Sequence, residues 1–203
     1  MANRRQTNQG QLDIDRVADT HGVEDNMGSF RNWLEGCFTI MKDTGFCVWW
    51  CDVSQFEYIK ALAEEVGFKV QSWPLTWHKT SACINQRAEY NFTKNTEIAI
   101  VLRKGDARLL SAQQSSVWSG GMTPTDKAKF AKHPFVKPDP LWAWLFEAIA
   151  LPGSTICDPF SGVGSMTLAA FSRGYQPVCC ELDPTHYNQQ ITNLSELIQT
   201  MQG

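Results

Sequence analysis

The chain has 203 residues, 43% of them hydrophobic, and its 18 lysines and arginines against 21 acidic residues give a formal net charge of −3. No apolar run is long enough to span a bilayer, and the slight negative charge argues against a surface that binds nucleic acid over its whole area. The seven cysteines are odd in number and lack the second pair or histidine cluster of a metal site, so we expect buried free thiols in a reducing, cytoplasmic compartment.

The length fits one domain. Residues 1–28 are polar and lack the hydrophobic core of a signal peptide. Residues 29–203 carry the apolar patterns of a folded protein, and we expect them to form that single domain.

Helices and strands alternate in the first part of this domain. Helical spacing of apolar residues predicts a helix at about 30–41, and an apolar strand at 46–51 follows it. Ser54 and Glu57 predict a capping box for the next helix, and Gly67 predicts its end.

The alternation predicts an α/β fold with a Rossmann-like, doubly wound and mostly parallel sheet. The segments 74–79 and 97–102 fit an antiparallel pair of strands at one edge of that sheet. Residues 106–132 are rich in Ser, Gln and Gly and predict either a mobile surface loop or a DNA-contacting segment. Lysines gather around its end, which is typical of a solvated face but also suits local contact with phosphates: Lys127, Lys129, Lys132 and Lys137.

A glycine turn follows the next apolar strand. That strand ends in Asp158, and Gly162 and Gly164 precede a helix, so that backbone N–H groups can approach a ligand closely. The following strand ends in Glu181, roughly 20 residues past the turn, where a βαβ unit places an acid on ribose hydroxyls. The two acids indicate a nucleoside cofactor, and the alternative is a tight turn with two surface carboxylates. No third glycine and no phosphate-loop lysine follow, which argues against a dinucleotide or a P-loop site.

The last element is a helix that begins at Pro184 behind Asp183. Its apolar residues fall on one face, which we expect to be buried: Tyr187, Ile191, Leu194 and Ile198.

The turn at 158–164 resembles the Asp-Pro-Phe-x-Gly-x-Gly motif of S-adenosylmethionine-dependent DNA methyltransferases that modify the exocyclic amino group of adenine or cytosine. Four further segments are similar to motifs of that family: 77–79, 95–105, 133–138 and 181–187. The resemblance extends from about Phe30 to the end of the chain. The half associated with catalysis comes first and the cofactor half last, which resembles the beta arrangement.

The resemblance implies S-adenosylmethionine as cofactor, DNA as substrate, a reduced target-recognition segment at 106–132, and a bacterial or phage restriction–modification setting. It also implies the residues that hold the cofactor. They are Asp158, which would accept the methionine ammonium, Phe160, which would pack on the cofactor, Gly162 and Gly164 in the turn, Glu181 on the ribose, and Lys137 and His133 at the methionine end.

One motif of the family is missing. Its catalytic tetrapeptide is an acid, Asn or Ser followed by Pro-Pro and an aromatic residue, and the chain contains no Pro-Pro pair. The catalytic residues and the choice between adenine and cytosine therefore stay unknown. The chain could be part of a longer enzyme, one half of a split enzyme, a degenerate copy that only binds cofactor or DNA, or a methyltransferase for RNA or a small molecule.

Overall fold

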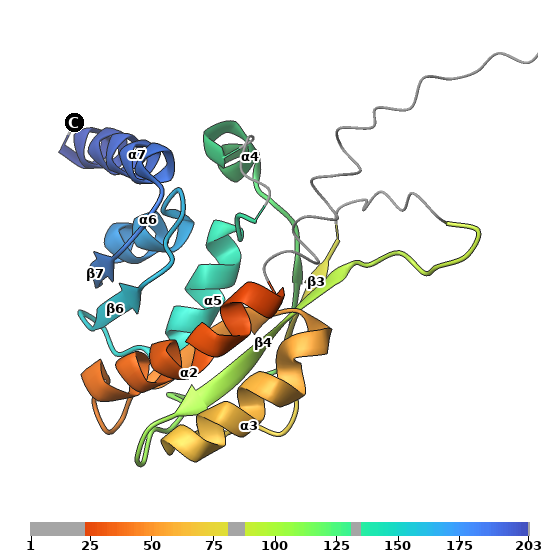
Figure 1. The fold of residues 1–203 in the computed structure, drawn as a ribbon. Coiled ribbons are helices and arrows are strands. Elements are labelled where there is room, and N and C mark those ends of the chain that lie inside the picture. Colours follow the sequence, from red (N-terminus) through yellow and green to blue (C-terminus); the bar gives the residue numbers. More distant parts are fainter. Residues whose placement is uncertain (1–22, 81–87, 131–134, 203) are drawn as a thin grey trace, which may run out of the picture. The chain divides into compact units, whose positions relative to one another are not determined.

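The computed structural model of the protein describes residues 23–80, 88–130 and 135–202 (Figure 1). The chain divides into two compact units. The first comprises the described residues up to Ser72 together with Ile100–Ala107, and the second comprises Trp73–Ala99 and the described residues from Arg108 onward. The strand β4, Thr96–Arg103, contributes its first half to the second unit and its second half to the first.

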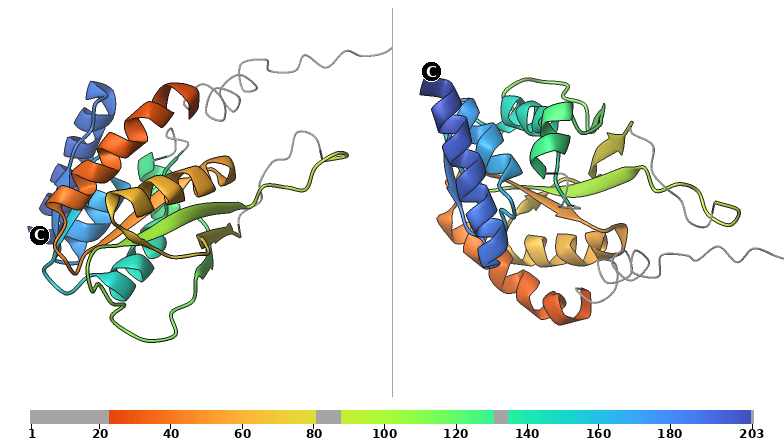
Figure 2. Two further views of the ribbon diagram at one scale, coloured as in Figure 1. Left: turned by 60° about the horizontal axis from the view of Figure 1, so that its bottom comes forward. Right: turned by 90° about the horizontal axis from the view of Figure 1, so that it is seen from above.

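The first unit consists of α2 (Val23–Ile40), β1 (Phe46–Cys51), the short 3-10 helix η1 (Val53–Gln55), α3 (Phe56–Val66), β2 (Lys69–Val70) and the end of β4. In the sheet, β1 is a neighbour of β4, and β2 pairs with β4 in antiparallel fashion, Lys69 opposite Arg103. The helices α2 and α3 pack on each other (Figure 2). Leu34 of α2 and Ile59 of α3 are completely buried.

Two local details differ from the sequence prediction. The capping box is formed by Asp52 and Gln55 around η1, two residues before the predicted pair. The Asp52 carboxylate accepts the N–H of Ser54 and the Gln55 side chain accepts the N–H of Asp52. Helix α2 begins at Val23 instead of near Phe30. Its first turns are polar, so apolar periodicity could not reveal them. The predicted end of α3 is confirmed, since Gly67 has a φ of 110° and donates to Ala63 and Glu64.

The second unit contains β3 (Leu75–Lys79), the start of β4, β5 (Val117–Gly120), α4 (Pro124–Phe130), α5 (Asp139–Ile149), β6 (Thr155–Asp158), α6 (Ser165–Ser172), β7 (Gln176–Cys179) and α7 (Pro184–Gln202). β3 is antiparallel to β4 and parallel to β5, while β6 and β7 form a parallel pair of their own. The predicted antiparallel pair is therefore confirmed, and the α/β fold has a mixed sheet. The stretch 106–132 contains β5 and α4.

The main core of the second unit lies around α6. This helix contacts β6, β7, α5 and α7 (Figure 1). Buried residues of α5 and α6, with the residue directly after α5, form one cluster: Phe146, Ala150, Met166, Ala169 and Ala170. Trp142, Ile156 and Tyr175 pack against it. This packing fixes the start of α6 against the end of β6, where the glycine turn lies.

Two predictions of burial are wrong. In α7, Tyr187 is 47% and Ile191 is 42% exposed, while the polar Gln190 and Asn193 are buried. The amide nitrogens of both residues find acceptors there: Gln190 donates to the Cys179 sulfur at 2.9 Å and Asn193 donates to the carbonyl of Val163 at 3.3 Å. The oxygen of Gln190 is buried without a hydrogen-bond partner among the residues that the structure describes.

The second wrong prediction concerns the thiols. Cys157 and Cys180 are exposed, because alternate residues of β6 and β7 are exposed and Cys180, directly after β7, continues this alternation. Neither takes part in a disulfide. Among the helices that the structure describes, none is long and apolar enough to cross a membrane.

Candidate functional site

The glycine turn is held in place by backbone hydrogen bonds at the carboxyl ends of β6 and β7. The Asp158 carboxylate accepts the N–H of Phe160 at 3.0 Å, which bends the chain directly after β6. The N–H and the hydroxyl of Ser161 both donate to the carbonyl of Cys180, and the N–H of Cys180 donates to the carbonyl of Asp158. These hydrogen bonds connect the glycine turn to the end of β7, directly before Glu181.

Gly162 and Gly164 both adopt positive φ, 54° and 85°, a conformation that glycine reaches without steric cost. Gly164 caps the start of α6. A Cβ on Gly164 would lie 2.5 Å from Cγ of Gln190, so the turn and α7 approach each other closely here. Gly162 contributes its N–H to the hydrogen bond that orients Glu181.

Glu181 is fixed against the glycine turn. Its Oε2 accepts the N–H of Gly162 at 2.7 Å and its Oε1 accepts the N–H of Asp183 at 2.9 Å. A carboxylate oxygen can accept more than one hydrogen bond, so each oxygen can still accept a hydroxyl. The sequence prediction that these two strand ends cooperate thus has a direct geometric counterpart, and the carboxylate is oriented before any ligand arrives.

A pocket of about 290 Å³ opens beside this carboxylate. Pro159, Phe160, Cys180, Glu181 and Leu182 line it. The side chain of Leu182 is 97% exposed and that of Phe160 is 57% exposed. Two large apolar side chains next to an oriented carboxylate suit a flat apolar ring attached to a group with hydroxyls. These residues therefore fit a nucleoside.

Sequence reasoning did not single out Leu182 as part of the site. The only signal was a large apolar residue directly after a strand-end acid, which many surface turns also show. Its exposure became evident only in the structure.

Asp158 lies at the other side of the turn, partly buried. The pKa of this carboxyl is raised, mainly because the group is buried, and the negative charge of Glu181 adds to this. The N–H of Phe160 and the positive charge of Lys137 act in the opposite direction but are weaker. Lys137 is 12% exposed and forms an ion pair with Glu97 of β4 at 3.2 Å. Lys137 and Glu181 thus lie within electrostatic reach of Asp158. His133 lies outside the described residues.

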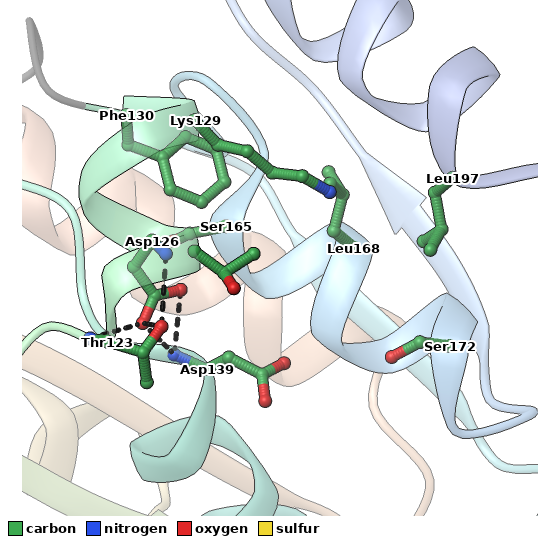
Figure 3. A pocket seen from close by; sticks show the side chains of 10 residues that line it. Thr123, Asp126, Lys129, Phe130, Asp139, Ser165, Leu168, Ser172 and Leu197 are labelled. Atoms are coloured by element: carbon green, nitrogen blue, oxygen red, sulfur yellow. Dashed lines mark hydrogen bonds between the residues drawn. The ribbon is translucent and has the colours of Figure 1, made fainter. Parts of the chain in front are cut away.

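A second hollow, of about 330 Å³, lies among α4, α5, α6 and α7 (Figure 3). Lys129 extends across it toward Leu168. Its acidic groups already have partners: the buried Asp126 accepts from the N–H and hydroxyl of Thr123, and Asp139 pairs with Arg173 at 2.5 Å. These acids cap and link helices, so we assign the hollow a structural role and keep the candidate site at the glycine turn.

Comparisons with known proteins point in one direction. A family model described as DNA methylase, for N6/N4 methyltransferases, matches residues 9–193. The type II methyltransferase M.HpaI of Haemophilus parainfluenzae is 26% identical over an alignment that covers 67% of this chain and 49% of that protein. The chain thus spans about half the length of this relative.

Solved structures agree in fold. The complex of M1.HpyAVI with SAM has a TM-score of 0.73 and 20% identity, with 84% of each chain covered. The cytosine-N4-specific PvuII DNA methyltransferase has a TM-score of 0.71 and 14% identity, with 94% of this chain and 75% of that chain covered. At such identities the similarity shows the fold alone, and it confirms the predicted fold class.

Proposed function

The chain belongs to the N6/N4 DNA methylase family, and we therefore propose that it binds S-adenosylmethionine at the glycine turn and serves the methylation of an exocyclic amino group of adenine or cytosine in DNA. The observation that carries the proposal is the Glu181 carboxylate, which is held by the N–H of Gly162 and lines one pocket together with the exposed side chains of Phe160 and Leu182. This arrangement offers a nucleoside both a ring contact and acceptors for ribose hydroxyls.

Each end of the cofactor has its own residues. We assign the adenine ring to Phe160 and Leu182, the ribose to Glu181, the methionine ammonium to Asp158 and the methionine carboxylate to Lys137. Gly162 and Gly164 keep the turn narrow enough for the backbone to approach the ligand. From the family resemblance, His133 belongs to the methionine end. Bound in this way, the cofactor supplies an electrophilic methyl group, and the residues of the chain fix its orientation.

The residues that would position the methyl acceptor are not all identified. An exocyclic amine is a poor nucleophile because its lone pair is delocalised into the base, so it has to be positioned in line with the methyl group. The chain has no Pro-Pro pair and so no tetrapeptide of the kind that does this in the family. We therefore assign no catalytic residue.

The missing pair favours a second candidate function. The chain would then be a cofactor-binding or DNA-binding relative without activity of its own, or would work with a further polypeptide that supplies the missing motif. Its coverage of about half of M.HpaI is compatible with either candidate.

Binding is the first test. Calorimetry with S-adenosylmethionine should show saturable binding to the wild-type chain. Glu181→Ala should weaken this binding by about 1.5–3 kcal/mol, because a charged acceptor of ribose hydroxyls is lost. Glu196→Ala on the exposed side of α7 is the matched control and should bind like wild type. Unchanged affinity in Glu181→Ala would remove Glu181 from the cofactor site.

Methyl transfer decides between the two candidates. Unmethylated DNA is incubated with the chain and S-adenosylmethionine, digested to nucleosides and analysed by mass spectrometry. A methylated adenine or cytosine would establish the enzyme and name its base. Absence of product with intact cofactor binding would support the binding relative or the half enzyme, whereas absence of binding would overturn the proposed site.

A further inference from the structure

We propose that Glu97 is a positioning residue that, together with Lys79, holds the Lys137 ammonium where it meets the carboxylate of an amino-acid end of the ligand. The proposal rests on the proposed function, because the ligand is taken to be S-adenosylmethionine or its product. It assigns a role to two residues of β3 and β4 that lie outside the glycine turn.

The geometry is that of one carboxylate shared by two ammonium groups. Glu97 Oε1 lies 2.5 Å from Nζ of Lys79, and Glu97 Oε2 lies 3.2 Å from Nζ of Lys137. Lys79 is on β3, Glu97 on β4, and Lys137 directly precedes Pro138, the N-cap of α5. The carboxylate therefore connects the sheet to the segment that enters α5.

Lys79 is itself restrained on its other side. Its ammonium lies 5.0 Å from the ring centroid of Trp77, the residue directly opposite Glu97 in the β3–β4 register. Trp77 is 4% exposed, and its indole N–H donates to the carbonyl of Gly120 at 2.9 Å. A cation over an indole face is attracted to it. The cluster is thus anchored in the sheet and not on a mobile surface chain.

The charges of the cluster match a zwitterion. Lys79, Glu97 and Lys137 together carry one net positive charge, and Asp158 supplies a separate negative charge close enough to feel Lys137. Burial alone raises the pKa of Glu97, but Lys137 and Lys79 more than offset this, and the pKa is lowered, so Glu97 stays ionised at neutral pH. An α-amino acid end offers an ammonium for Asp158 and a carboxylate for Lys137. Without Glu97, the Lys137 side chain would regain its rotamer freedom and lose its fixed direction.

The experiment compares two ligands that differ only at this end. S-adenosylhomocysteine carries the amino-acid group, and 5′-methylthioadenosine carries the same nucleoside without it. Calorimetric affinities for both are measured with wild type, Lys137→Met, Glu97→Gln, Glu97→Asp and Lys79→Met. Lys60→Met, a lysine of α3 with a surface partner in Glu57, serves as the control for loss of a positive charge.

We expect Lys137→Met to weaken S-adenosylhomocysteine by about tenfold or more and to leave 5′-methylthioadenosine unchanged, since only a charge-assisted contact is lost. Glu97→Gln and Lys79→Met should show the same selective loss to a smaller extent, and Glu97→Asp should recover part of it. Because 5′-methylthioadenosine reports on a folded nucleoside pocket, its binding also shows that each variant is folded.

Three results would overturn the inference. An unchanged preference between the two ligands in Glu97→Gln would remove Glu97 from the recognition of the amino-acid end. Equal weakening of both ligands would reduce the cluster to a structural ion pair. Tighter S-adenosylhomocysteine binding in Glu97→Gln would mean that Glu97 competes with the ligand for Lys137. If wild type binds neither ligand, the proposed function itself fails, which is a separate and recognisable outcome.

Discussion

Gly164 is the residue at which the glycine turn and the last helix meet. Its φ of 85° and the position of Gln190 impose two separate constraints, one on backbone conformation and one on space. Gly174 has a similar φ of 76°, but a Cβ there would meet nothing within 4 Å. Comparing alanine substitutions at Gly164 and Gly174 therefore separates the free-energy cost of the backbone conformation from that of steric crowding.

We expect Gly174→Ala to reduce the free energy of unfolding by about 1–2 kcal/mol, the cost of a left-handed conformation for an L-residue. Gly164→Ala should cost about 1–3 kcal/mol more, because its methyl group would displace the buried Gln190. Urea unfolding of both variants measures the difference. Equal losses would show that Gln190 moves aside freely and that close packing at the turn is unimportant.

At the scale of elements, one buried acid connects two helix starts. Asp126 is 4% exposed, and its Oδ2 accepts the N–H of Thr123 at 3.0 Å and the Thr123 hydroxyl at 2.6 Å (Figure 3). It also lies 3.4 Å from the N–H of Asp139 in the first turn of α5, whose N-cap Pro138 has no side-chain cap. Asp126 thus fixes α4 to the start of α5, directly beyond Lys137.

We expect Asp126→Ala to lower the free energy of unfolding by about 1–3 kcal/mol, because it leaves partly buried donors at both helix starts without this acceptor. Asp183→Ala is the control. Asp183 accepts the N–H groups of Thr185 and His186 at the start of α7 but is exposed, so water can replace it and the loss of stability should be smaller than in Asp126→Ala. Chemical denaturation compares the two, and a smaller loss in Asp126→Ala than in Asp183→Ala would contradict this account.

At the scale of the whole molecule, the strand β4 belongs to both compact units. Its residues Thr96–Ala99 pair with β3 in the second unit, and its last residues, Leu102 and Arg103, pair with β2 in the first. Neither unit has a complete sheet without this strand. We therefore keep the prediction of a single folding domain, although its first described helix starts at Val23 and not after residue 28, and regard the two units as parts of it.

This leads to a prediction about unfolding. Because β4 cannot leave one unit without disrupting the other, we expect a single cooperative thermal transition, with calorimetric and van't Hoff enthalpies that agree. Differential scanning calorimetry of the whole chain measures both. Two resolved transitions would show that the units fold independently and that the single-domain prediction is wrong.

The sequence determined what depends on local chemistry. Glycines at 162 and 164 permit the positive φ values of the turn, Gly67 ends α3, and the acids Asp158 and Glu181 fall at strand ends because apolar runs stop there. The motif around Asp158, together with the four further segments, indicated the family, and the comparison confirmed it. Such features depend on residues that are neighbours along the chain.

Which faces are buried, and which distant side chains meet, depends on how the elements pack. Gln190 and Asn193 lie on the inward face of α7, where their amide nitrogens donate to β7 and to the glycine turn. The spacing of apolar residues does not predict such contacts. The contact of Glu97 with Lys137 and the exposure of Leu182 beside Glu181 likewise depend on how strands and helices pack. Local hydrogen bonding and backbone conformation can be read along a chain, whereas burial and long-range pairing arise only when its elements pack together.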